Sequence, residues 1–385
     1  MKNGHRGIDY RVVADENVAI TPSLNAICRS LVRIPGRAIT TDYLKDADIL
    51  LVRSVTPVDQ RLLMNTPIVF VGTATAGLDH IDLNYLSANN IGFAAAPGAN
   101  ANAVAEYVLS VLAARGRLPH ILAGGGLGVV GYGHVGRRLA EVVSALGGAV
   151  YVWDPLQSVP DRYNGLSLEH VLNQPVVSVH AALHTNEPWP SRALVDVEEV
   201  TACSGDCLFI NASRGEIVTE AALAKLDRMG AEIVLDVWPD EPAISEHQLD
   251  RVVLGTPHIA GYSLEAKWCA TNMLASAITG EKIVQPANLP DIIDMRAFET
   301  QSVDDWLSAL ILSHYDPMDD YRQLCSVAAG SVSGDAFEGL RRSYRLRGEL
   351  RGRRVRVGKR LPESILSACR ALGVTPVAAN GVGSE

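Results

Sequence analysis

The stretch LGVVGYGHVG at residues 127–136 is an apolar run that passes into three glycines with the spacing G-x-G-x-x-G. The apolar half predicts a buried strand, and the residues that follow the glycines predict a helix. In a turn of this kind Gly131 permits the tight bend, Gly133 lets a pyrophosphate approach the backbone, and Gly136 lets helix and strand pack closely. Amide groups at the start of the helix favour a phosphate there. The motif therefore predicts a dinucleotide-binding domain.

A carboxylate follows the next predicted strand. Asp154 comes directly after residues 149–153, where it can accept hydrogen bonds from both ribose hydroxyls and would repel the extra phosphate of NADP. A plain turn residue before Pro155 is the alternative role. Beside the glycine turn, Asp154 favours NAD as the cofactor.

Apolar runs on both sides of this motif alternate with helical stretches, which predicts an α/β protein with parallel sheets covered by helices. One series predicts a doubly wound Rossmann-type domain, with strands at 127–130, 149–153, 176–180, 208–211, 233–237 and 252–255. The first hundred residues predict a second sheet, with strands at 8–14, 47–52, 67–71 and 91–95 and helices at 21–31, 59–65 and 82–88. A helix at 102–115, capped by Asn102, joins the two. A strand at 354–357 and a helix at 364–372 predict a third, small α+β unit.

Length and composition limit the class of protein. A chain of 385 residues with 48% hydrophobic and 20% charged residues predicts two or three globular domains. The net charge of −9 disfavours nucleic acid as a partner of the whole molecule. Six cysteines without metal-type spacing predict free thiols and no metal site, and no signal peptide or apolar run of about 18 residues is present. We therefore expect a cytoplasmic protein with no membrane contact.

The segment at residues 341–360 is strongly basic, with nine Arg and one Lys against one Glu. A nucleic-acid patch is one interpretation. The interpretation we favour is a set of solvated side chains flanking the strand at 354–357, or anion contacts at a subunit boundary, because the segment contains one aromatic residue and no recognisable binding motif.

Three predicted strands of the Rossmann series end in residues that can carry chemistry. Arg214 follows the strand at 208–211, Glu241 lies after the strand at 233–237, and His258 after the strand at 252–255. Parallel strands bring these ends to one edge of the sheet, beside the dinucleotide site. Each residue alone has a structural explanation, as a surface cation, a loop acid or a core histidine, but their joint occurrence favours an active site.

These residue types suit the oxidation of a hydroxy acid. His258 can accept the hydroxyl proton as hydride leaves C2, because an unperturbed imidazole titrates at about 6.5. Glu241 would hold the imidazole and stabilise its protonated form. Arg214 offers a planar fork to the carboxylate and to the developing 2-oxo group.

Taken with the glycine turn, the three motifs resemble the D-isomer-specific 2-hydroxyacid dehydrogenase family. The similarity extends over nearly the whole chain, from ADEN (14–17), VRSVT (52–56), VGTATAG (71–77) and AAPG (95–98) to GTPHIAGYSLE (255–265) and the carboxyl tail around 314–344. It implies NAD-dependent oxidation of a small phosphorylated hydroxy acid, 4-phospho-D-erythronate, to its 2-oxo acid in pyridoxal 5′-phosphate biosynthesis.

The resemblance also implies domains and contacts. It divides the chain into a flavodoxin-like substrate-binding lid domain (1–100, completed by 259–280), a Rossmann-type NAD-binding domain (101–258) and a C-terminal domain (285–385) that forms a homodimer. It places cofactor contacts at Asp154, Ala212, Ser213, Arg214, Asp236 and Gly261, in addition to the three glycines. It places substrate contacts at Ser54, Thr75 and Tyr262.

Recognition of the substrate phosphate rests on Arg53, which follows a strand of the first sheet and offers bidentate geometry. A structural ion pair is the alternative role for Arg53. The chain departs from the family at Ala181 and Ala182, where relatives carry Thr-Pro, so one hydroxyl contact to the cofactor is missing. The alternative functions are another D-2-hydroxyacid dehydrogenase, such as one acting on 3-phosphoglycerate, and a non-catalytic NAD-sensing scaffold.

Overall fold

The structure is a computed structural model that describes residues 9–163, 167–283, 292–298, 302–345, 347–358 and 361–378. The chain forms two compact units, one comprising Met1–Asn100 and Ser263–Asn288 and the other comprising Ala101–Tyr262 and Leu289–Glu385. The predicted third domain, whose first residues lie outside the described ones, stays a prediction.

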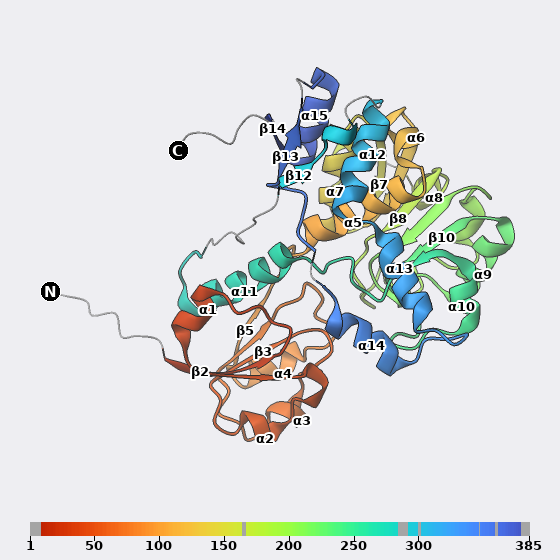
Figure 1. Cartoon of the computed structure of the whole chain (residues 1–385). Helices are drawn as coiled ribbons and strands as arrows, with labels where there is room; N and C mark the ends of the chain where they lie inside the picture. The colour runs from red at the N-terminus through yellow and green to blue at the C-terminus, as the bar shows by residue number, and fades with distance from the viewer. Residues whose placement is uncertain are drawn as a thin grey trace. The chain divides into compact units, whose positions relative to one another are not determined.

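The first unit is built on a parallel sheet with the strand order β2-β1-β3-β4-β5, which is the predicted flavodoxin-like order. Its elements are β1 (Tyr10–Asp15), α1 (Pro22–Ile27), β2 (Cys28–Ile34), η1 (Gly36–Ala38), α2 (Thr41–Leu44), β3 (Ile49–Val52), α3 (Gln60–Leu63), β4 (Phe70–Thr73), α4 (Leu83–Ala88), β5 (Gly92–Ala95) and α11 (Leu264–Thr279). Helices α1 and α11 cover one face of the sheet, and α2, α3 and α4 cover the other (Figure 1). Each face therefore has its own apolar core.

One predicted element of this unit is wrong in its second half. The predicted helix at 21–31 ends at Ile27, and Cys28–Ile34 forms the edge strand β2 beside β1. Thr21 caps the helix by accepting a hydrogen bond from Leu24 N–H at 3.2 Å. Because an edge strand contacts only one neighbour, β2 keeps most of its side chains exposed and shows no clean alternation.

The second unit contains a parallel sheet with the strand order β11-β10-β9-β8-β6-β7. Its strands are β6 (Gly126–Val130), β7 (Ala149–Trp153), β8 (Val176–Val179), β9 (Leu208–Asn211), β10 (Glu232–Leu235) and β11 (Val252–Gly255). Its helices are α5 (Ala101–Ala114), α6 (Leu118–Leu122), α7 (His134–Ala145), η2 (Asp161–Tyr163), α8 (Leu168–Leu172), η3 (Glu199–Ala202), η4 (Gly215–Ile217), α9 (Glu220–Met229) and α10 (Glu246–Arg251). Strand β7 lies on one side of β6, and the strands from β8 onward lie on its other side. A doubly wound sheet binds ligands at this change of direction, between β6 and β8. The Rossmann-type prediction is thereby confirmed.

The C-terminal segment packs onto this second sheet. It contains β12 (Ile292–Asp294), η5 (Arg296–Phe298), α12 (Val303–His314), α13 (Pro317–Ser326), α14 (Gly334–Ser343), β13 (Arg354–Val357), α15 (Glu363–Leu372) and β14 (Thr375–Ala378), with the strands in the order β12-β13-β14. Trp306 and Val355 share one apolar core with Val129 and Leu139 of the Rossmann elements. Figure 1 shows α12 beside α5 and α6. The tail is therefore part of the core on that face of the sheet.

No helix in the described part of the chain has the length and apolar character needed to cross a bilayer. Within the same residues, no group of three or more His, Cys, Asp or Glu side chains is arranged to hold a metal ion.

Candidate active site

The glycine turn joins β6 to α7. Gly131 has a φ of +101°, and a methyl group there would lie 2.6 Å from the backbone nitrogen of Ala181. At Gly136 a methyl group would lie 2.0 Å from the carbonyl oxygen of Gly131, so the close approach of α7 to the turn requires glycine. Gly133 differs, because nothing lies within 4 Å of its added methyl position. The turn therefore leaves open space next to Gly133, at the N-terminus of α7.

Asp154 fixes this turn to the end of β7. One of its carboxylate oxygens accepts the N–H of Tyr132 at 2.7 Å, and the other accepts the N–H groups of Leu156 and Gln157 at 2.8 and 3.0 Å. The predicted contact of Asp154 with ribose stays a prediction, and the structure adds this second role for the carboxylate.

These features fit a bound dinucleotide. The N-cap of α7 is Gly133, which makes no side-chain capping bond, so the amide groups of the first turn have no side-chain acceptor from the cap. Open space at Gly133 lies in front of them. Both are what a pyrophosphate group needs at this place.

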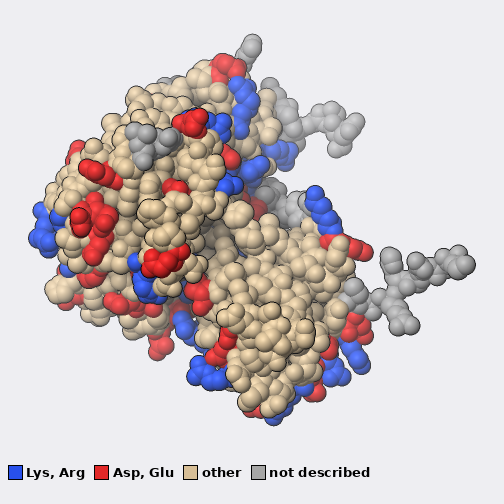
Figure 2. Space-filling view, turned by 180° about the vertical axis from the view of Figure 1, so that it is seen from behind, with Lys and Arg blue, Asp and Glu red and all other residues tan. Residues whose placement is uncertain are grey.

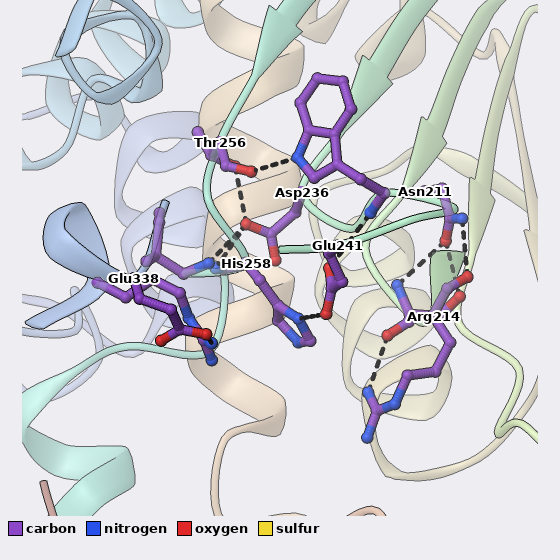
Figure 3. Close-up of polar contacts among 12 residues, drawn as sticks. Asn211, Arg214, Asp236, Glu241, Thr256, His258 and Glu338 are labelled. Atoms are coloured by element: carbon purple, nitrogen blue, oxygen red, sulfur yellow. Dashed lines mark hydrogen bonds and ion pairs between the residues drawn. The ribbon is translucent and has the colours of Figure 1, made fainter. Parts of the chain in front are cut away.

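The side chains of His258 and Glu241 form a hydrogen-bonded pair (Figure 3). Nδ1 of His258 lies 2.6 Å from Oε1 of Glu241, and Oε2 of Glu241 accepts the N–H of Trp238 at 3.3 Å. Burial alone would raise the pKa of Glu241, but the His258 charge and hydrogen bond, together with the Arg341 charge, hold that pKa below its ordinary value. An ionised carboxylate only accepts, so Nδ1 carries the hydrogen and Nε2 is left as the basic nitrogen.

The backbone at His258 lies in the left-handed region, with φ at +56°. A non-glycine residue adopts this conformation only where neighbouring contacts hold it. The N–H of His258 donates to the Asp236 carbonyl at 2.8 Å, and Oδ1 of Asp236 accepts the N–H groups of Ile259 and Ala260 at 2.7 and 3.0 Å. Thr256 donates to the same oxygen at 2.7 Å. Asp236 thus shapes the turn that carries His258.

Asp236 is buried, and burial raises the pKa of its carboxyl group. It was predicted to contact the cofactor, and that role stays a prediction. Its hydrogen bonds give it a structural role that the sequence did not indicate.

Arg214 follows β9 and is held by Asn211. Asn211 Nδ2 donates to the Arg214 carbonyl at 3.0 Å, and Asn211 Oδ1 accepts the N–H and hydroxyl of Ser213 at 3.1 and 2.7 Å. The guanidinium donates to the Ser213 carbonyl at 2.9 Å. Since β9, β10 and β11 are neighbours in the sheet, Arg214 comes from the same edge as the Glu241–His258 pair, as Figure 3 shows. Asn211 is a site residue that the sequence analysis did not single out, although it ends a predicted strand.

The remaining predicted residues fall into both units. Tyr262 is buried in the second unit, its ring centroid 5.9 Å from that of Tyr344, and Ala212 and Gly261 are half-buried there. In the first unit, Arg53 and Ser54 follow β3, and the Thr75 hydroxyl lies 2.8 Å from that of Thr73 beyond β4. The predicted substrate contacts of the first unit thus lie at the carboxyl edge of its sheet.

The basic segment differs from its predicted solvated character. Arg341 and Arg353 are buried, and Arg347 donates to the backbone carbonyls of Ile259 and Ala260 directly after the catalytic histidine candidate. On the face shown in Figure 2, basic and acidic side chains are scattered among uncharged ones. Some arginines of this basic segment are therefore buried and make contacts inside the second unit.

Comparisons with known proteins identify the relatives of this chain. A family model described as the NAD binding domain of D-isomer specific 2-hydroxyacid dehydrogenase matches residues 106–260. A protein of Marinobacter nauticus named erythronate-4-phosphate dehydrogenase is 40% identical over 382 residues, which cover 94% of this chain and 98% of that protein. A Pseudomonas syringae protein of the same name is 38% identical, with coverage of 95% and 100%.

Solved structures show the same fold. NAD⁺-bound 3-phosphoglycerate dehydrogenase of Entamoeba histolytica matches with a TM-score of 0.58 and 21% identity, over 71% of this chain and 94% of that one. D-lactate dehydrogenase of Aquifex aeolicus, complexed with NAD and lactic acid, matches with a TM-score of 0.56 and 21% identity, over 72% and 100%.

The chain therefore belongs to the D-isomer specific 2-hydroxyacid dehydrogenase family and is an NAD-dependent dehydrogenase. Within that family it is similar over nearly its whole length to proteins named erythronate-4-phosphate dehydrogenase. The family and the cofactor predicted from the sequence are confirmed.

Proposed function

We propose that this dehydrogenase oxidises 4-phospho-D-erythronate at C2. The observation that carries the chemistry is the 2.6 Å contact between His258 Nδ1 and Glu241 Oε1 at the strand edge that also holds Arg214. The choice of substrate is supported by the relatives of that name, which are 36–40% identical to the chain.

His258 serves as the base. Its Nε2 accepts the proton of the C2 hydroxyl, and Glu241 stabilises the imidazolium that results. Arg214 binds the substrate carboxylate and the oxygen at C2. Bound NAD⁺ supplies the hydride acceptor. Gly131, Gly133 and Gly136, with Asp154, would hold the cofactor, assisted by Ala212, Ser213, Asp236 and Gly261.

Substrate contacts are assigned to Ser54, Thr75 and Tyr262, with Arg53 as the predicted phosphate ligand. A homodimer through residues 285–385 and a place in pyridoxal 5′-phosphate biosynthesis are part of the proposal. We also propose a cytoplasmic location, and the six free cysteines are in keeping with a reducing compartment.

A substrate panel tests the proposal. The purified protein with NAD⁺ is assayed for NADH formation with 4-phospho-D-erythronate, 3-phosphoglycerate, D-lactate and D-glycerate. We expect kcat/KM for 4-phospho-D-erythronate to exceed each of the others by at least about tenfold, a difference of about 1.4 kcal/mol in transition-state binding. A higher kcat/KM for 3-phosphoglycerate would make that acid the proposed substrate instead. Absence of turnover with all four acids, together with intact NAD binding, would favour the non-catalytic NAD-sensing scaffold.

The variant His258→Gln tests the role of His258 as the base. It should lower kcat by roughly 10²–10⁴-fold, the usual value of positioned acid–base catalysis, with little change in NAD affinity. Turnover close to that of the wild type near neutral pH would remove His258 as the base.

A further inference from the structure

Arg341 is a buried cation that the mechanism above does not use. It lies in the last turn of α14 and is 8% exposed. Its Nη1 donates to Glu338 Oε1 at 3.2 Å, and it shares a hydrogen bond with Tyr262. Its Nε is buried and has no hydrogen-bond partner among the described residues. A buried N–H of a charged group without an acceptor costs free energy, so its presence needs an explanation.

The surroundings of Arg341 belong to the active site. Its guanidinium carbon lies 5.6 Å from the ring centroid of Tyr262, four residues after His258, and its charge helps to lower the pKa of Glu241. In Figure 3 Glu338, the ion-pair partner of Arg341, lies to the left of His258, and Glu241 and Arg214 lie to its right. Arg341 is therefore a second cation, besides Arg214, in the neighbourhood of His258.

The chemistry of the proposed substrate supplies the missing acceptor. A 2-hydroxy acid with a terminal phosphate carries two anionic groups, and Arg214 is assigned to the carboxylate. Phosphate oxygens accept charge-assisted hydrogen bonds from a guanidinium, often two at a time. Tyr262 presents a hydroxyl beside the same guanidinium.

We propose that Arg341, together with Tyr262, forms the subsite for the terminal phosphate of the substrate, in place of Arg53, the ligand predicted from the sequence. This inference rests on the proposed function. It assigns a specificity-determining role to a residue of the C-terminal segment.

The alternative role for Arg341 is to keep Glu241 ionised. That role would affect every hydroxy acid to the same extent, because the His258–Glu241 pair acts on C2 whatever the other end of the substrate carries. A phosphate subsite affects only substrates that carry phosphate. Comparison of 4-phospho-D-erythronate with D-erythronate therefore separates the two roles.

The test uses Arg341→Met and Arg341→Lys, with Arg345→Met as the matched control. Arg345 is exposed, lies two residues beyond the end of α14, and loses the same charge when it is changed to Met. We expect Arg341→Met to raise KM for 4-phospho-D-erythronate by roughly 10- to 100-fold, the value of one or two charged hydrogen bonds, and to leave D-erythronate within about twofold. Arg341→Lys, which keeps the charge without the fork, should lose less. Arg345→Met should match the wild type.

A second measurement does not depend on turnover. Titration calorimetry with inorganic phosphate should give a Kd about tenfold or more higher for Arg341→Met than for the wild type and Arg345→Met, and a smaller increase for Arg341→Lys. Far-UV circular dichroism and NADH affinity check that each variant is folded, and Arg341→Lys carries the test if Arg341→Met is not.

Three results would overturn the subsite. The first is an equal rise in KM for D-erythronate and for 4-phospho-D-erythronate in the Arg341 variants. The second is unchanged phosphate binding in a folded Arg341 variant. The third is a phosphate-specific rise in KM that occurs in Arg53→Ala and not in the Arg341 variants. Failure of the proposed function gives a different result: the wild type then prefers another acid in the panel, while phosphate binding still depends on Arg341.

Discussion

Gly131 and Gly133 are two residues apart in one turn, yet a methyl group would meet different surroundings at each. At Gly131 it meets the Ala181 backbone at 2.6 Å with φ at +101°, whereas at Gly133 it meets nothing within 4 Å. We expect Gly131→Ala to lower the free energy of unfolding by about 1–3 kcal/mol, through strain. Gly133→Ala should keep the stability within about 0.5 kcal/mol and weaken NAD binding by roughly tenfold, because the methyl group fills the cofactor's space. Urea unfolding and NAD titration measure both. Normal NAD affinity in Gly133→Ala would show that the pyrophosphate lies elsewhere.

The His258–Glu241 pair makes a prediction about the role of charge. The His258 charge and hydrogen bond hold the pKa of Glu241 below its ordinary value, so its carboxylate is ionised across the neutral range. The imidazolium that forms during oxidation then lies 2.6 Å from a carboxylate oxygen. Glu241→Gln keeps an acceptor but removes the charge, so we expect kcat to fall by roughly 10²-fold with little change in NAD affinity. A kcat close to that of the wild type at saturating substrate and NAD⁺ would mean that Glu241 does not act through its charge.

At the scale of elements, the sequence predicted the strands of the second sheet well because each is a short apolar run bounded by polar or glycine residues. The bounds of β7 and β9 match the predicted ones. One failure has a long-range cause. Asn102 was expected to cap α5, but the helix begins at Ala101, and the Asn102 amide instead donates to Glu106 and Glu349 at 2.8 and 2.7 Å. A partner 247 residues away leaves no mark in the neighbouring sequence.

Arg347 connects the C-terminal segment to the turn after β11. Its guanidinium lies 4.2 Å from the Tyr315 ring centroid and donates to the carbonyls of Ala103 and Ile259 at 3.2 and 3.1 Å, and to that of Ala260. Lysine cannot donate in these directions at once, because its single ammonium group lacks the planar fork. We expect Arg347→Lys to lower the free energy of unfolding by about 1–3 kcal/mol and kcat by roughly tenfold, since His258 precedes these carbonyls.

The measurement for Arg347 is a pair of kcat and KM values with an unfolding curve. Arg345→Lys, which changes an exposed side chain, is the control. A loss of stability with unchanged kcat would mean that Arg347 contributes to stability alone. The turn after β11 would then position His258 without help from Arg347.

For the whole molecule, the sequence predicted both sheets and the edge that carries the catalytic candidates, but not the way the tail is used. Alternation of strands and helices determines a parallel sheet, and the ends of its strands then meet. The pattern of a C-terminal helix shows that one face is apolar without showing which surface covers it. Trp306 and Val355 therefore could not be assigned to the core of Val129, nor could Arg341 be placed beside Tyr262. The basic segment was misinterpreted for that reason.

Glu106 connects α5 to the tail and makes the stability depend on pH. Its carboxyl accepts the N–H groups of Leu350 and Arg351 at 2.7 and 3.1 Å, and burial, with the nearby Glu349 charge, raises its pKa from 4.5 to about 7. The unfolded chain releases this proton near pH 4.5 and the folded one near pH 7. The stabilising contribution is therefore complete below pH 4.5 and is lost as pH rises to about 7, a change of about 3 kcal/mol.

Glu106→Gln cannot release a proton, so its stability relative to the wild type should rise by that amount between pH 4.5 and 8. Urea unfolding across this range measures the difference, with Glu141→Gln, an exposed change on α7, as the control. Arg138, whose Nε donates to Asn102 at 2.7 Å, is the cation that could offset the effect. Parallel stability curves for wild type and Glu106→Gln would mean that Arg138 and the backbone donors already keep Glu106 ionised in the folded protein, and the tail would then be held by a charged carboxylate across the whole range.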